Sequence, residues 1–179
     1  MFASVGMDLD AGFASTARAK NLFMFSSKIL IIAICPKSLS TSVIYEYMPV
    51  SLAEISGPEL CDRSVAAVLI QVLQGLAYIH KNKLTCFDLK SRNVLIDFKG
   101  TVKLWPTEFG ERHLNLAHDL KALRNLVQAL MQGYESDPPK IDDRSRWGEG
   151  CLMFFDTLIT AESLDELPEG WAKPISIRR

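Results

Sequence analysis

The sequence predicts an α+β domain in which short strands come early and amphipathic helices dominate the second half. Two segments near the start, residues 28–35 and 42–48, are rich in β-branched and aromatic residues. Residues 62–80 and 116–131 instead repeat apolar residues at helical spacing, and a glycine-bearing hairpin pattern lies between them. A chain of 179 residues, 48% hydrophobic and 23% charged, is long enough to bury one core, so we expect a single globular domain.

The charge balance indicates neither a nucleic acid nor an anionic membrane as partner, because 20 Lys and Arg face 21 Asp and Glu. The four cysteines are widely spaced and form no C-x-x-C pair. This argues against zinc and a disulfide framework and predicts an intracellular, cytoplasmic protein. The most apolar run, residues 22–35, is interrupted by Lys28 and is shorter than the ~20 residues of a membrane helix, so we expect no membrane span.

The amino-terminal region is expected to hold a loose start and a hairpin. Residues 1–20 show no sustained period and are rich in Ala, Ser and Gly, which favours a loose segment. Residues 28–35 and 42–48 are interpreted as two strands because "PKSLST" between them supplies turn residues. The alternative for residues 28–35 is a buried helix segment, since a short apolar run fits either structure.

A long amphipathic helix is predicted over residues 62–80, with Asp62 as its N-cap. Its apolar stripe consists of Val65, Val68, Leu69, Val72, Leu76 and Ile79. Farther along, "NVLID" and "TVKL" predict two short strands. Phe98, Lys99 and Gly100 join them, with glycine where a tight turn needs backbone freedom.

The second half of the chain predicts further helices. Residues 133–150 are polar and contain Pro and Gly, which indicates a connection. "CLMFFDTLIT" and "AESLDEL" predict one or two final helices, the second over residues 161–167 with Thr160 as a cap. Before them, residues 116–131 carry a buried stripe of Leu116, Leu120, Leu123, Val127, Leu130 and Met131.

The order of helix, polar loop and hairpin carries a resemblance to a known family. "FDLKSRNVLIDFKGTVKL", residues 87–104, resembles the catalytic loop and following hairpin of eukaryotic protein kinases, in which an Asp and an Asn stand five positions apart. "VIYEYMPVSL", residues 43–52, is similar to the hinge between the two kinase lobes. The resemblance covers residues 42–167. It implies a protein-kinase-like fold, with an N-lobe remnant and hinge in residues 21–48 and a helical C-lobe in residues 49–179.

By this resemblance, three residues of the loop match the chemistry of phosphoryl transfer. Asp88 matches the base that accepts the proton of the substrate hydroxyl, and Lys90 matches the cation that Ser/Thr kinases place against the transferred group. Asn93 matches a ligand of a magnesium ion bridging the phosphates, because a hard cation prefers oxygen donors. The implied cofactors are therefore ATP and Mg²⁺. The alternative is that the three residues form an ordinary polar turn.

The resemblance also implies an adenine site. Tyr45 matches the residue at the back of the adenine pocket, and Leu95 matches the floor beneath the ring. The hinge backbone that hydrogen-bonds adenine matches Glu46, Tyr47 and Met48. Residues of these types are also common in an ordinary core, so that alternative stays open.

Asp119 matches the helix Asp that holds the backbone of the kinase catalytic loop. The alternative is a solvated surface Asp. Thirteen positions lead from Pro106 to Asp119, far fewer than the family uses between these landmarks. This interval normally builds the platform for a peptide substrate, so we expect little of that platform here.

Several positions depart from the family pattern. Cys86 and Phe87 replace the His-Arg pair before Asp88. Pro106 stands where the metal-binding Asp of Asp-Phe-Gly is expected, and "EFG" supplies Glu108 as a metal ligand displaced by two residues. Upstream of the hinge, the first 44 residues contain neither G-x-G-x-x-G nor V-A-I-K.

These departures predict a degenerate, inactive kinase-like domain that works as a binding or scaffold module. A protein partner would bind the C-lobe surface that the missing upper lobe leaves exposed. The alternative is a Ser/Thr protein kinase whose N-lobe is missing from this chain through truncation. A third reading is an unrelated α/β protein with a chance motif.

Overall fold

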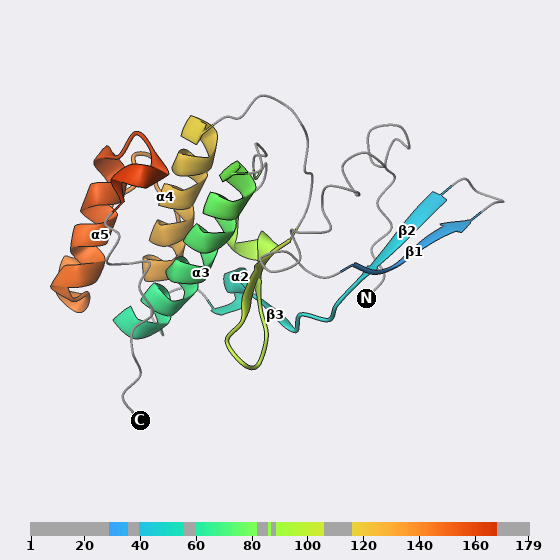
Figure 1. Cartoon of the computed structure of the whole chain (residues 1–179). Coiled ribbons are helices and arrows are strands. Elements are labelled where there is room, and N and C mark those ends of the chain that lie inside the picture. The colour runs from blue at the N-terminus through green and yellow to red at the C-terminus, as the bar shows by residue number, and fades with distance from the viewer. Residues whose placement is uncertain are drawn as a thin grey trace.

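The computed structural model describes residues 29–35, 40–55, 60–81, 86, 89–105 and 116–167, and for residues 29–45 it describes the backbone. A group of helices and a small sheet form the body, and the amino-terminal hairpin projects away from it (Figure 1). This confirms the predicted α+β class. The first twenty residues lie outside the described part, so the loose start stays a prediction.

The amino-terminal hairpin pairs β1 (Ile29–Cys35) with β2 (Ser40–Tyr45) in antiparallel register. The pairing runs from Cys35 opposite Ser40 to Ile29 opposite Tyr45. Branched side chains favour this extended backbone over a helix. The hairpin interpretation is thus confirmed against the buried-helix alternative, although the second strand begins and ends earlier than predicted.

A three-stranded antiparallel sheet follows, in the order β3 (Val50–Ser51), β4 (Val94–Ile96) and β5 (Val102–Leu104). The β4–β5 pair is the hairpin predicted from "NVLID" and "TVKL". Strand β3 was not predicted, because two residues carry no detectable period. It attaches the end of the hinge-like segment to the edge of the hairpin.

The turn between β4 and β5 is built by Asp97 and Gly100. The carbonyl oxygen of Asp97 accepts the amide of Gly100 at 3.0 Å, and its carboxylate accepts the amides of Lys99 and Thr101 at 2.8 Å each. Gly100 has a φ of 81°, in the left-handed region that favours glycine. Gly100 therefore adopts the backbone conformation for which glycine was predicted at this position.

Helix α3 (Asp62–Lys81) follows the short helix α2 (Leu52–Ile55) and is the longest described helix. All six residues of its predicted stripe are buried. Its N-cap prediction was wrong: the helix begins at Asp62, so Cys61 precedes it, and the Asp62 carboxylate accepts the amide of Gly148 at 3.0 Å instead. By length and composition α3 could cross a membrane, but its apolar side packs into the core.

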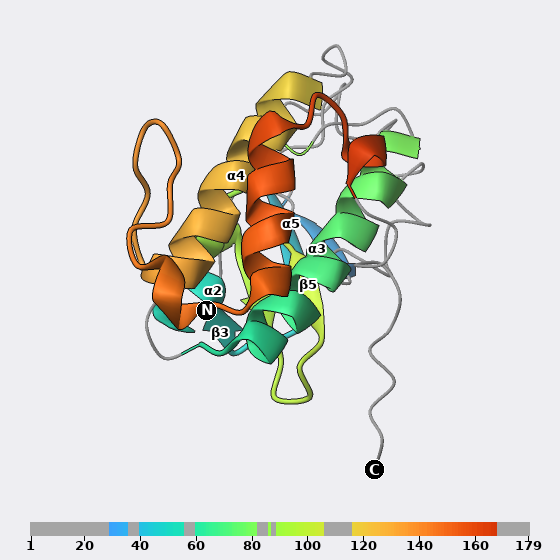
Figure 2. The same ribbon diagram turned by 90° about the vertical axis from the view of Figure 1, so that its left-hand side faces the viewer.

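Helices α4 (Leu116–Gln132) and α5 (Glu149–Thr160) stand beside α3 (Figure 2). Leu116 is exposed at the start of α4, so the predicted stripe begins effectively at Leu120. The three helices and the sheet enclose one core. Its largest fully buried apolar side chains are Leu52, Leu69, Leu76, Ile79, Leu123, Leu126, Leu130, Met131, Phe154, Phe155 and Leu158.

The helix predicted over residues 161–167 was wrong in extent, because only a 3₁₀ turn, η4 (Leu164–Glu166), forms there. The Glu166 carboxylate accepts the amide of Glu162 and the hydroxyl of Ser163, which closes a single turn. Thr160 is not its cap, since the Thr160 hydroxyl donates back to the Thr157 carbonyl at the end of α5. Another 3₁₀ turn, η3 (Arg144–Arg146), precedes α5.

Candidate functional site

The loop that carries the predicted catalytic residues leads into the 3₁₀ turn η2 (Ser91–Asn93) and then into β4. Lys90 is exposed and its carbonyl oxygen accepts the Asn93 amide at 2.8 Å. Leu89 is 3% exposed and anchors the loop in the core. Asp88 lies outside the described residues, so its proposed role as a base stays a prediction.

Asn93 is tied to the end of β5. The amide of Trp105 donates to the Asn93 carbonyl oxygen at 2.6 Å, which continues the pairing of Val94 with Leu104. The residue that follows Trp105 in the sequence is Pro106, which has no carboxylate. Glu108, the substitute metal ligand predicted from "EFG", lies outside the described residues and stays a prediction.

Asp119 is fully buried on α4 and holds the start of the catalytic loop. Its Oδ2 accepts the Cys86 amide at 3.2 Å and shares a 2.7 Å hydrogen bond with His80 Nε2. Its Oδ1 lies 3.6 Å from His118 Nδ1. The expectation that this Asp holds the loop backbone is confirmed, and the surface alternative is wrong.

Sequence reasoning missed His80, which links the end of α3 to Asp119. A signal existed: His80 stands four positions after Leu76 and so continues the buried stripe with a polar side chain. A polar residue at such a position needs a buried partner, because an unpaired buried polar group is costly.

The hinge-like segment is attached to the sheet by a charged pair. Glu46 pairs through its carboxylate with the ammonium of Lys103 on β5, and the Lys103 side chain is 9% exposed. Lys103 stands opposite Leu95 across the β4–β5 ladder, so the two side chains share one face of the sheet. The pair therefore lies beside the predicted floor of the adenine site. Lys103 was placed in the strand "VKL" from the sequence, but its pair with Glu46 was not predicted.

The other residues of the hinge-like segment differ in exposure. The Tyr47 side chain is 81% exposed, and Met48 is half-buried. Only the backbone of Tyr45 is described, so its role at the back of an adenine pocket stays a prediction. The structure thus brings Glu46 to the sheet that carries Leu95, while the Tyr47 side chain points to solvent.

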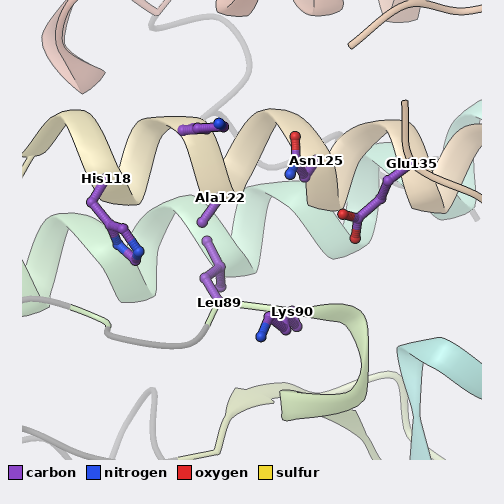
Figure 3. A pocket seen from close by; sticks show the side chains of 7 residues that line it. Leu89, Lys90, His118, Ala122, Asn125 and Glu135 are labelled. Carbon is purple, nitrogen blue, oxygen red and sulfur yellow. The ribbon is translucent and has the colours of Figure 1, made fainter. Parts of the chain in front are cut away.

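A pocket of about 320 Å³ opens beside the catalytic loop, between that loop and α4 (Figure 3). Lys90 is the one predicted site residue that lines it among those described. The rest of the wall comes mainly from α4. The lining residues are Leu89, Lys90, His118, Lys121, Ala122, Asn125 and Glu135.

Comparison with known proteins places these features in a family. The family model for the protein kinase domain matches residues 21–117, more than half of the chain. This match includes the hinge-like segment, the catalytic loop and the β4–β5 hairpin.

Curated relatives are protein kinases. Cyclin-dependent kinase 9 of Homo sapiens is 32% identical over 96 residues, which cover 50% of this chain and 25% of that protein. A serine/threonine-protein kinase of Saccharomyces cerevisiae is 36% identical over 149 residues, covering 70% of this chain and 22% of that protein. Serine/threonine-protein kinase dst3 of Dictyostelium discoideum is 35% identical over 78 residues, covering 41% and 14%. The chain thus spans a quarter or less of the length of these three relatives.

Proposed function

The chain belongs to the protein kinase domain family, and from this premise we propose that it acts as a binding or scaffold module that does not transfer phosphate. The family transfers the γ-phosphoryl group of Mg²⁺-bound ATP by positioning and electrostatic stabilisation. A member that lacks several charged parts of this machinery keeps the fold and loses the chemistry. Its role must then come from its surface.

The observation that carries the proposal is the hydrogen bond from the Trp105 amide to the Asn93 carbonyl at 2.6 Å. This bond holds the end of β5 beside Asn93, the predicted metal ligand. The next residue in the chain is Pro106, where the family has the Asp that binds magnesium. A hard cation needs oxygen ligands, and proline offers no side-chain oxygen. The described donors therefore do not fit the magnesium–ATP complex of an active kinase, and we derive no catalytic step through it.

The hinge supports the same proposal. The buried Lys103 ammonium neutralises the Glu46 carboxylate, so the link from hinge to sheet is made by the protein's own side chains. Within the 179 residues, no Gly-rich loop or V-A-I-K lysine supplies charge to bound phosphates. These two features support a binding role that does not depend on a nucleotide.

We propose that the partner is a protein and that it binds the C-lobe surface around α4. Helix α4 presents polar side chains beside the catalytic loop, where a pocket is open to a ligand. We also propose an intracellular location, which the free thiols of Cys61, Cys86 and Cys151 support. No nucleic acid or membrane partner is proposed, since the net charge is close to zero.

A thermal-shift titration of the purified chain with ATP and Mg²⁺ tests the proposal. A ligand at 100 times its dissociation constant would add about 2.7 kcal/mol to the free energy of unfolding. We expect ATP and Mg²⁺ to shift neither the wild type nor Asn93→Ala from its own ligand-free curve, while an active kinase run in parallel is stabilised. A clear Mg²⁺-dependent shift that Asn93→Ala abolishes would reject the proposal.

A second candidate is a Ser/Thr kinase that obtains its upper lobe from a longer chain or from a partner. The spacing of Asp88, Lys90 and Asn93 favours it, because all three family types stand at matching positions. This candidate predicts transfer to a protein substrate when a kinase upper lobe is supplied on a fused chain. Asp88→Asn would abolish that transfer.

A further inference from the structure

The pocket beside the catalytic loop is walled by one side of α4. Lys121 and Ala122 stand three and four positions after His118, and Asn125 stands four and three positions after them, so the four residues lie on one side of the helix. These residues are exposed or half-buried, whereas Leu123 and Val127 face the core. The pocket is thus lined by the side of α4 that the core does not use.

The two ends of the pocket differ in chemistry (Figure 3). His118 lies at one end of the row along α4 and Glu135 at the other, with Leu89 pointing toward the helix from the loop and Lys90 beside it on the loop. Leu89 points toward Ala122, so the middle of the pocket is apolar. Ammonium groups and a carboxylate surround this apolar floor.

Polar groups around the pocket are available for a ligand. In the part of the chain that the structure describes, the side chains of Lys121, Asn125 and Glu135 form no hydrogen bond or ion pair with another residue. Lys121 and Glu135 are exposed and Asn125 is half-buried, so these side chains can reach a ligand in the pocket. They suit a ligand that carries both an anionic and a cationic group.

The segment that follows Glu135 is held by the fully buried side chain of Gln128. The Gln128 amide nitrogen donates to the Ser136 hydroxyl at 2.7 Å and to the Lys140 carbonyl at 2.6 Å. Its amide oxygen accepts the Ser136 amide at 2.8 Å. The segment after α4 is therefore held against the helix, which preorganises this end of the pocket.

We propose that this pocket binds a phosphoserine or phosphothreonine of a partner protein, with a basic residue of the same peptide against Glu135. A phosphate monoester carries close to two negative charges and three acceptor oxygens. The Lys121 ammonium and the Asn125 amide supply matching donors, and Lys90 adds positive charge on the loop side of the pocket. Leu89 and Ala122 accommodate the side-chain carbons that carry the phosphate. The inference rests on the proposed binding function and names its ligand.

Binding of peptides to the full chain, without nucleotide, tests the inference. The probe is an oriented library of short fluorescent peptides with a central phosphoserine and flanking basic residues, and its matched control carries unmodified serine. We expect binding of the phosphorylated library, weakened about tenfold or more without the phosphate, since charge-assisted hydrogen bonds are lost. Lys121→Ala should weaken binding of the phosphorylated library by a similar factor. Glu135→Gln should reduce the preference for peptides with basic flanking residues.

Lys140→Ala is the matched control variant, because Lys140 is an exposed lysine that does not line the pocket. It should bind like the wild type, and circular dichroism should show all variants folded. Equal binding of both libraries, no binding at all, or inorganic phosphate competing as well as the peptide would overturn the inference. The outcome is independent of the ATP titration. If the chain binds neither ATP nor phosphopeptides, the scaffold proposal stands and only the proposed ligand is rejected.

Discussion

The ammonium of Lys103 pairs with the carboxylate of Glu46, and this pair joins β5 to the segment that leads out of the amino-terminal hairpin. The two residues are 57 positions apart in the chain. Because their side chains are 9% and 23% exposed, solvent screens the pair only in part. The pair is therefore expected to matter for the stability of the hinge.

Breaking this pair should destabilise the protein. We expect Lys103→Met to lower the free energy of unfolding by about 1 to 3 kcal/mol, because it leaves a poorly solvated carboxylate without its cation. Adding Glu46→Gln should recover part of the loss. Lys140→Met, which breaks the exposed pair with Asp142, is the control and should cost less than about 1 kcal/mol. Urea denaturation measures all four proteins, and equal effects of the two lysine changes would contradict this account.

Removing the Asp119 carboxylate should loosen the catalytic loop. Asp119→Ala leaves the Cys86 amide and the His80 ring without their acceptor, at about 1 to 3 kcal/mol for each buried group. Hydrogen exchange should also accelerate at the Cys86 amide. Asp165→Ala, at an exposed site in η4, should change neither quantity. Unchanged protection of Cys86 in Asp119→Ala would show that the carboxylate does not hold the loop.

The turn at Gly100 should reject a side chain for backbone reasons alone. A Cβ atom built there meets nothing within 4 Å, so no clash adds to the cost. The φ of 81° still penalises alanine, by about 1 to 2 kcal/mol. Asn tolerates this conformation better, so Gly100→Asn should lose less stability than Gly100→Ala. Thermal denaturation of both variants makes the comparison, and an equal loss would argue against a left-handed turn.

Acid should weaken the same hairpin through Asp97. The amides of Thr101 and Lys99 donate to its carboxylate and lower its pKa below the ordinary value of 3.8. A lowered pKa stabilises the fold above the ordinary value, and this contribution is lost as the pH falls through the folded value. The stability difference between the wild type and Asp97→Asn should therefore shrink as the pH drops below about 4. Denaturation curves collected across acidic pH test this, and a constant difference would refute it.

Much of the fold was predictable because its signals are local. The stripes of residues 62–80 and 116–131 repeat at helical spacing, and Gly100 marks a turn that few other residues accept. The two-residue strand β3 carries no such period and depends on its neighbour β4. The helix expected over residues 161–167 failed because the Glu166 carboxylate closes a single turn.

The candidate site was predictable where a motif carries it and hidden where distant residues meet. Asp119 could be assigned from its place in the kinase pattern, whereas the role of Asn93 stays a prediction. The partners of His80 and Lys103 could not be assigned, because they lie 39 and 57 positions away. No site was predicted on the polar side of α4, since a pocket forms only when the loop and the segment after α4 are folded against it.

The absence of phosphoryl transfer is the central claim, and a transfer assay with γ-labelled ATP tests it most directly. The purified chain is incubated with Mg²⁺ and a basic protein rich in Ser and Thr, beside Asp88→Asn and an active kinase. We predict that the wild type and Asp88→Asn give the same background incorporation, while the active kinase labels the substrate. Incorporation above background by the wild type, lost in Asp88→Asn, would contradict the account.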